Sequence, residues 1–262
     1  MARQQGVIAF TGKLNGLSYY KRNNQYWVRM PGGPSREQIR HSPSCVRIQE
    51  SNDEFTGATQ VAKTFRTSLP TAILNMKDTY FSVRLNGVFK RMCDLGEGIR
   101  GQRSISTAQH GKLLRGFAFT KGVPFDSVFQ AKVSFSVNPE RTEVYASASS
   151  LRPMQTIRFP KAATHFRLLF SVVSLCDYIS TDKVYAPVLP AFNGLSAMTE
   201  SAILPLDSTL SPFVLRAGFA QVTHLPVDVA LVLCMGIVFY QRVDGVDYVL
   251  ADGSCAGVVE VL

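Results

Sequence analysis

The chain has 262 residues, of which 46% are hydrophobic and only 18% are charged, so it can bury a large core. This composition excludes a disordered or polyelectrolyte chain. The net charge of +9 is uneven, because residues 1–115 hold 18 Lys and Arg against 7 Asp and Glu, whereas residues 116–262 hold 10 against 12. A basic N-terminal half therefore precedes a nearly neutral C-terminal half.

The N-terminal residues show no targeting signal. Met-Ala-Arg-Gln-Gln-Gly contains no apolar segment and no small-residue cleavage pattern. The most apolar run, Val227 to Tyr240, contains Asp228 and is shorter than the roughly 20 residues that a membrane helix needs. The five cysteines are odd in number and form no Cys-x-x-Cys pair, which is typical of reduced thiols. We therefore expect a cytoplasmic protein without a membrane span.

Residues 1–34 are predicted to form a basic β-hairpin arm. Aromatic and β-branched residues favour strands, and the expected runs are 7–10, 17–21 and 26–30. Asn23 and Asn24 supply a tight turn between the last two runs, because Asn tolerates the left-handed backbone conformation. Pro31 and Pro34 end the last strand, since proline has no N–H to donate to a ladder.

Residues 35–98 are predicted to be helical. Ser35 is a helix cap, and two apolar stripes at helical spacing follow on either side of Pro70. The first stripe is Phe55, Ala58, Ala62, Phe65 and Leu69, and the second is Leu74, Phe81, Leu85, Val88, Met92 and Leu95. Each amphipathic helix must bury its stripe against the other helix or against a neighbouring subunit.

Residues 99–115 are polar and basic, and we expect a linker there. Short strands at close spacing then predict an antiparallel β-sandwich over residues 116–262, either jelly-roll-like or immunoglobulin-like. The expected strands are 131–137, 143–148, 155–159, 166–176, 183–188, 214–222, 229–240, 248–250 and 257–262. Asp244-Gly245 is a hairpin signature between two of them. The expected fold class is therefore α+β: a hairpin arm, two amphipathic helices and an antiparallel sandwich.

No catalytic or cofactor motif is present in the sequence. It contains no G-x-S-x-G, G-x-G-x-x-G or P-loop pattern, and its four histidines show no metal-ligand spacing. The Gly-rich run from Gly96 to Gly101 lacks a preceding strand and a following helix, which favours a helix end over a phosphate loop. We therefore expect no enzyme activity, no metal, no cofactor and no small-molecule substrate.

The N-terminal arm combines positive charge with aromatic side chains. Eight Lys and Arg precede position 48, against the single acid Glu37. Cations attract phosphates and aromatic rings stack on bases, so nucleic acid is one partner that fits. Aromatic rows on hairpins also pack onto cores, and arginines pair with acids of a neighbouring subunit. The candidate residues for either contact are Lys21, Arg22, Arg29, Arg36, Arg40, Tyr20, Tyr26 and Trp27.

The same N-terminal segment carries a spaced sequence motif. From Gly6 to Lys21 it reads G-x-I-x-F-x-G-x-L-x-G-L-S-Y-Y-K, and Y-x-V-R and Pro-Gly-Gly follow. The motif resembles the start of a family of uncharacterised proteins common in Bacteroidetes. The family is also similar to this chain at Ala202 to Leu206 and at Phe239 to Tyr248. That family has no established activity, so the resemblance implies a taxonomic and cytoplasmic setting and no catalytic residue.

These features favour a non-enzymatic structural protein. A two-stranded hairpin is marginally stable alone, and exchange of the arm between identical subunits would stabilise it. A basic arm before a neutral sandwich also parallels, by architecture alone, many small capsid proteins. We therefore expect self-assembly into a homo-oligomer, shell or filament through the N-terminal arm and the helices. The alternative is a nucleic-acid-binding module that uses the basic N-terminal half.

Overall fold

The computed structural model describes residues 2–6, 9–30, 32–210 and 212–262. The protein has an α+β fold, and its chain divides into two compact units, Met1–Gln49 and Glu50–Leu262. In the described part of the chain, no helix has both the length and the hydropathy that crossing a membrane requires.

The N-terminal unit holds a four-stranded antiparallel sheet in the order β1-β4-β3-β2. Its strands are β1 (Ala2–Arg3), β2 (Gly12–Leu14), β3 (Leu17–Arg22) and β4 (Gln25–Arg29). Asn15 and Gly16 join β2 to β3, and Asn23 and Asn24 join β3 to β4; all four have positive φ, as type I′ hairpin turns require. The hairpin predicted from the sequence is confirmed, together with its Asn-Asn turn.

Two short strands extend this hairpin beyond the sequence prediction. β1 pairs with β4 and β2 pairs with β3, so the predicted pair becomes the middle of a larger sheet. The strand expected at residues 7–10 does not form at residues 9 and 10, while residues 7 and 8, like Pro31, lie outside the described residues. Strands of two and three residues are too short to show an alternating pattern.

The helical region begins after the sheet. Ser35 and Gln38 form a capping box at the start of α1 (Arg36–His41), each side chain bonding the other residue's backbone N–H. The elements that follow are the 3₁₀ turn η1 (Pro43–Cys45), α2 (Val46–Ser68), α3 (Thr71–Leu74) and α4 (Phe81–Leu95). The second predicted helix is thus in two pieces, because the chain turns between α3 and α4.

Most residues of the two predicted stripes are buried, including Ala58, Phe65 and Leu85. Phe55 and Leu95 are exposed, so neither is buried within the single chain. Leu95 is the last residue of α4. At the turn of α2 that contains Phe55, the neighbouring Glu54 is buried instead. Its carboxylate binds Arg103, which is too distant in the sequence for a local pattern to reveal.

Residues 99–115, expected to be a linker, contain the helical turns α5 (Thr107–His110) and η2 (Gly111–Leu114). Ile105 and Leu114 are completely buried there. Single apolar residues in a polar stretch have no period, so the sequence pattern did not mark them as core. The turn α6 (Phe125–Val128) lies further along the chain.

The second unit is built around two long antiparallel strands, β7 (His165–Leu175) and β13 (Ala230–Val243), which pair along the whole of β7. They belong to a six-stranded sheet with β10 (Ser196–Glu200), β11 (Leu204–Pro205), β14 (Val246–Val249) and β15 (Cys255–Val261). Most residues of β7 and β13 are buried, including consecutive ones that project to opposite sides, so both faces of this sheet are covered.

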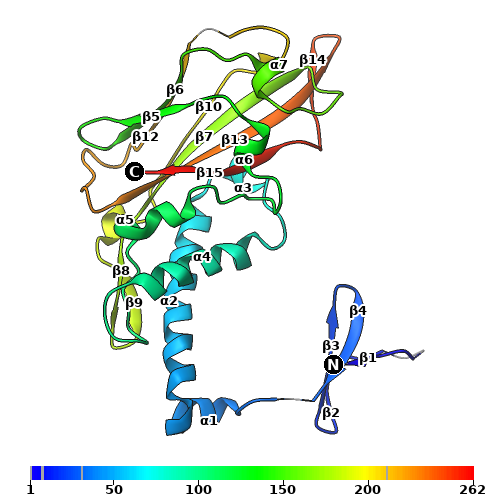
Figure 1. The fold of residues 1–262 in the computed structure, drawn as a ribbon, viewed down its shortest axis with the longest axis vertical. Coiled ribbons are helices and arrows are strands. Elements are labelled where there is room, and N and C mark those ends of the chain that lie inside the picture. The colour runs from blue at the N-terminus through cyan, green and yellow to red at the C-terminus, as the bar shows by residue number, and fades with distance from the viewer. Residues whose placement is uncertain (1, 7–8, 31, 211) are drawn as a thin grey trace. The chain divides into compact units, whose positions relative to one another are not determined.

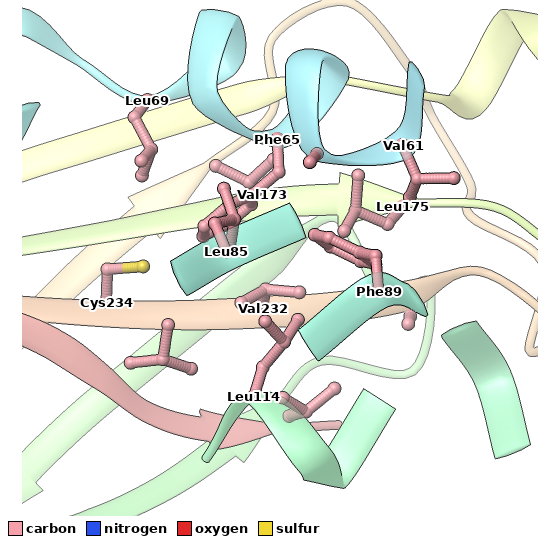
Figure 2. Close-up of a cluster of buried hydrophobic side chains, with 14 of the residues drawn as sticks. Val61, Phe65, Leu69, Leu85, Phe89, Leu114, Val173, Leu175, Val232 and Cys234 are labelled. Carbon is pink, nitrogen blue, oxygen red and sulfur yellow. The ribbon is translucent and has the colours of Figure 1, made fainter. Parts of the chain in front are cut away.

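Helices cover one face and a second sheet covers the other (Figure 1). Figure 2 shows Phe65 of α2 and Phe89 of α4 packed toward Val173 of β7 and Val232 of β13. The other face shares a core with the sheet β12-β6-β5, made of β5 (Ser134–Val137), β6 (Glu143–Ala148) and β12 (Phe213–Gly218). The C-terminal half therefore contains several antiparallel sheets.

Most of the predicted C-terminal strands are present, and the Asp244-Gly245 hairpin is confirmed. The strand expected at residues 155–159 is wrong, because Pro153 starts the helical turn α7 (Pro153–Thr156). The hairpin β8 (Tyr178–Thr181) with β9 (Val184–Pro187) was predicted only in its second strand. The short turn η3 (Pro190–Phe192) precedes β10.

Candidate functional site

The N-terminal sheet has two chemically different faces. In an antiparallel pair, residues directly opposite one another project to the same face, and successive residues project to opposite faces. Tyr20 lies opposite Trp27, and Tyr19 lies opposite Val28. These two pairs therefore mark the two faces, which we call the basic face (Tyr20 and Trp27) and the apolar face (Tyr19 and Val28).

The basic face carries four cations around two aromatic rings. Its members, from the register of the four strands, are Arg3, Lys13, Ser18, Tyr20, Arg22, Gln25, Trp27 and Arg29. The four cations are exposed and the two rings are half-buried. The guanidinium of Arg29 lies 5.6 Å from the centroid of the Tyr20 ring, within the range of a cation–π contact. The sheet has no carboxylate, because no Asp or Glu precedes Glu37.

A shallow hollow of about 190 Å³ lies on the basic face near the β3–β4 turn. Its lining is Tyr20, Arg22, Asn23, Gln25 and Trp27. Pockets that enclose a drug-sized ligand measure roughly 300–1,000 Å³, so this hollow is too small for such a ligand. It is suited to one flat group laid against the aromatic rings.

The residues of the N-terminal sheet do not bury the side chains of its apolar face. Its members are Ala2, Leu14, Leu17, Tyr19, Lys21, Tyr26 and Val28. The ring of Phe10 packs on Tyr19 with 4.8 Å between centroids. Phe10 is nevertheless 43% exposed and Leu14 is 54% exposed, and no described side chain of residues 2–30 is buried.

The eight candidate contact residues do not share one surface. Tyr20, Arg22, Trp27 and Arg29 lie on the basic face, Lys21 and Tyr26 lie on the apolar face, and Arg36 and Arg40 are exposed on α1. The Lys21 ammonium lies 5.4 Å from the Tyr26 ring centroid, on the apolar side. The candidate set is thus divided between two sheet faces and a helix.

Two cations of the basic face, Arg3 and Lys13, were not among the candidates. Asn15-Gly16 is a hairpin signal, and it would have placed Lys13 opposite Ser18. No local signal existed for Arg3, which reaches the basic face by pairing with Trp27.

The positive charge is concentrated in the N-terminal unit. Residues 1–49 hold eight Lys and Arg against one Glu, whereas residues 50–262 hold 20 against 18. The second unit is therefore nearly neutral overall and is not an acidic counterpart to the N-terminal unit.

A second group of charges is buried in the larger unit. The Glu54 carboxylate accepts hydrogen bonds from Arg103 Nε and Nη2 at 2.7 Å each, from the Gly101 N–H at 2.8 Å and from Lys90 Nζ at 3.0 Å. Asp94 also accepts hydrogen bonds from Arg103 and Lys90. These contacts join α2 and α4 to the segment that follows α4.

The Glu54 carboxylate is ionised at neutral pH. Burial raises its pKa, but hydrogen bonds from Arg103, Gly101 and Lys90 lower it by more, to about 2. Burial also raises the pKa of the nearby Cys93 thiol, so that thiol is poorly nucleophilic. Both Glu54 oxygens are occupied by donors, so the group acts as a structural clamp between elements.

Other side chains in the described part of the chain do not form an evident chemical site. No three or more His, Cys, Asp or Glu among the described residues are grouped so as to hold a metal ion. A hollow of about 500 Å³ beside β6 and β12 is lined by Ser134, Ser147, Ser149 and Lys132 with apolar residues. Among the described residues, its lining contains no histidine or carboxylate that would activate a serine.

Comparisons with known proteins found no match to the chain among protein-family models, curated proteins or solved structures. Function is therefore inferred from the geometry of the chain itself, and chiefly from the two faces of the N-terminal sheet.

Proposed function

We propose that this protein is a non-enzymatic structural subunit that self-assembles, with the apolar face of its N-terminal sheet docking on a second copy of the chain. The supporting observation is a face of apolar and aromatic side chains on which no described side chain is buried. A small sheet needs a covered hydrophobic face to be stable in water. A second copy supplies that cover.

The apolar face offers enough surface to drive association. Complete burial of a Leu or Phe side chain contributes roughly 1.5–3 kcal/mol. Phe10 and Leu14 are about half exposed, and Leu17 and Tyr19 are partly exposed beside them. The strand order also leaves β2 at a sheet edge, where unpaired backbone groups can pair with a neighbour's strand.

The helices and the C-terminal sheets belong to the same proposal. Val83 and Leu95 of α4 are exposed, so the second unit also has apolar side chains available to neighbours. The core shared by the central sheet and the sheet β12-β6-β5 supports a sandwich of the jelly-roll-like or immunoglobulin-like kind. A shell or filament of such subunits in the cytoplasm is the assembly that we propose.

Light scattering of the purified, nuclease-treated full chain at micromolar concentration tests this proposal. We expect particles larger than a monomer. The double variant Phe10→Ser/Leu14→Ser is expected to shift them to a smaller size, because it replaces the most exposed large apolar side chains at the apolar face. The control Met154→Ser/Val227→Ser alters residues that are 63% and 75% exposed in the second unit, and it should keep the wild-type size.

Two results would contradict the proposal. One is a monomeric wild type at every concentration and salt condition, which would mean that the chain covers its own apolar face. The other is equal loss of size in both double variants, which would assign assembly to general surface hydrophobicity. Far-UV circular dichroism of each variant checks that the helices and sheets of the second unit remain folded.

A further inference from the structure

We infer that the basic face of the N-terminal sheet binds single-stranded nucleic acid, with phosphates on its four cations and a base stacked against Tyr20 and Trp27. The inference concerns the sheet face opposite to the one proposed for assembly. Either function can therefore fail while the other stands.

Each strand of the sheet contributes one cation to the basic face. Arg3 comes from β1, Arg29 from β4, Arg22 from β3 and Lys13 from β2. Neighbouring strands lie about 4.8 Å apart, so the cations span the full width of the sheet, roughly 15 Å. With no carboxylate on the sheet, this charge is not neutralised there, and a polyanion is the complementary partner.

The register places the aromatic rings between the cations. Tyr20 and Trp27 lie directly opposite each other on neighbouring strands. Lys13 and Arg29 lie two residues away on one side and Arg22 lies two residues away on the other, a spacing of roughly 7 Å along each strand. A stacked base would therefore have cations on both sides to meet its flanking phosphates.

The aromatic rings and amides favour nucleic acid over an acidic protein. Base–aromatic stacking contributes roughly 1–3 kcal/mol per base, whereas Asp and Glu side chains have no aromatic ring to stack. The hollow beside Tyr20 and Trp27 is also lined by Asn23 and Gln25, whose amides can donate and accept hydrogen bonds at a base edge. Unpaired bases can reach the rings and the bases of a duplex cannot, so the single-stranded form is the ligand.

Trp27 is the only tryptophan in the chain, and its fluorescence therefore reports directly on this face. Titration of the full chain with a short oligothymidine, and separately with an oligouridine, is expected to quench Trp27 emission in a saturable manner. The affinity should fall with salt at a slope near −3 in log–log form, because each of four phosphate contacts on a single strand contributes about −0.7.

Two polyanions without accessible bases are the comparison ligands. Polyglutamate and a DNA duplex are expected to bind more weakly and to leave Trp27 emission nearly unchanged. Equal quenching by polyglutamate would assign the face to an acidic protein and would overturn the inference. Absence of any change with the oligonucleotides at low salt would also overturn it, whatever the light scattering shows.

Matched variants locate the contact, with binding followed by the anisotropy of a labelled oligonucleotide. Arg22→Ala/Arg29→Ala is expected to weaken binding about tenfold or more and to flatten the salt slope by about 1.4. The control Arg152→Ala/Arg158→Ala removes the same charge from exposed positions in the second unit and should stay within about twofold of the wild type. Equal losses in both pairs would show that net charge alone attracts the oligonucleotide.

Two single substitutions, compared with each other, distinguish the two faces. Lys21 and Arg22 are neighbours in β3 but project to opposite faces. Lys21→Ala should therefore weaken binding less than Arg22→Ala, although each removes one positive charge. A larger loss for Lys21→Ala would place the oligonucleotide on the apolar face. The quenching of Trp27 in the wild type tests the inference without any variant, so it remains a valid test if a substitution destabilises the sheet.

Discussion

The carboxylate of Glu54 and the guanidinium of Arg103 meet in a two-pronged contact, with hydrogen bonds of 2.7 Å from Nε to Oε1 and from Nη2 to Oε2. Paired bonds of this kind between ionised groups are among the strongest polar contacts in proteins. The side chain of Glu54 is only 1% exposed. Loss of either partner would therefore leave a charge in a site from which water is largely excluded.

We expect Glu54→Gln to lower the free energy of unfolding by roughly 3 kcal/mol, because it removes one partner of a buried ion pair. Chemical denaturation followed by far-UV circular dichroism measures this. The control Asp247→Asn breaks the Arg242–Asp247 pair near the surface, where ion pairs contribute little. A loss for Glu54→Gln no larger than that for Asp247→Asn would contradict the clamp role.

The same carboxylate is expected to make stability fall in acid. Its pKa is about 2 in the folded chain against an ordinary value of 4.5, so the unfolded chain takes up this proton at a higher pH. The stabilisation is present above pH 4.5 and is lost as the pH falls toward 2. In Glu54→Gln the decline over this range should be shallower, by up to about 1.4 kcal/mol per pH unit. Denaturation midpoints at several pH values check this, and parallel curves would contradict it.

Two helical glycines are expected to respond in opposite ways to alanine. A Cβ at Gly57 would lie 2.5 Å from Cγ of the Tyr185 ring, whereas a Cβ at Gly87 would meet nothing within 4 Å. Gly87→Ala should stabilise the protein by about 0.5–1 kcal/mol through helix propensity. Gly57→Ala should destabilise it, since overpacking costs about 1–3 kcal/mol. Thermal unfolding of both variants tests this, and shifts of the same sign would contradict it.

The helices show what the sequence could predict and where it could not. Spacing of Ala58, Ala62 and Phe65 identified the buried side of α2, because periodicity records which side of a helix faces a core. The same spacing put Phe55 on this apolar stripe, but Phe55 is exposed in the single chain. Burial of the neighbouring Glu54 depends on Arg103, which lies 49 positions away in the sequence, and no local pattern reports so distant a partner.

In the N-terminal sheet, too, the sequence predicted a local turn but not the pairing of distant residues. Asn23 and Asn24 identified the β3–β4 turn, and that turn alone sets Tyr20 opposite Trp27. The sequence prediction grouped Lys21 and Arg22 together by charge, although alternation along a strand separates them. Arg3 joined the basic face through a pairing that only the folded sheet defines.

The cysteines are expected to be unreactive in the native protein. All five thiols are free and buried. Burial raises the pKa of Cys176 to about 11 and that of Cys255 to about 12, so little thiolate forms near neutral pH. A chromogenic thiol reagent should therefore react slowly with the native chain and titrate all five thiols after unfolding in guanidinium. Rapid reaction of native Cys176 or Cys255 would contradict this burial.

The two faces of the N-terminal sheet are expected to act independently. Phe10→Ser/Leu14→Ser should reduce particle size but retain quenching of Trp27 by oligothymidine, because the basic face keeps its four cations. Arg22→Ala/Arg29→Ala should weaken the quenching but keep the particle size of nuclease-treated protein. Light scattering and fluorescence of the same samples measure both responses. If one double variant removed both responses while circular dichroism showed intact helices, assembly and nucleic-acid binding would be a single event, as in a shell that forms only around its nucleic acid.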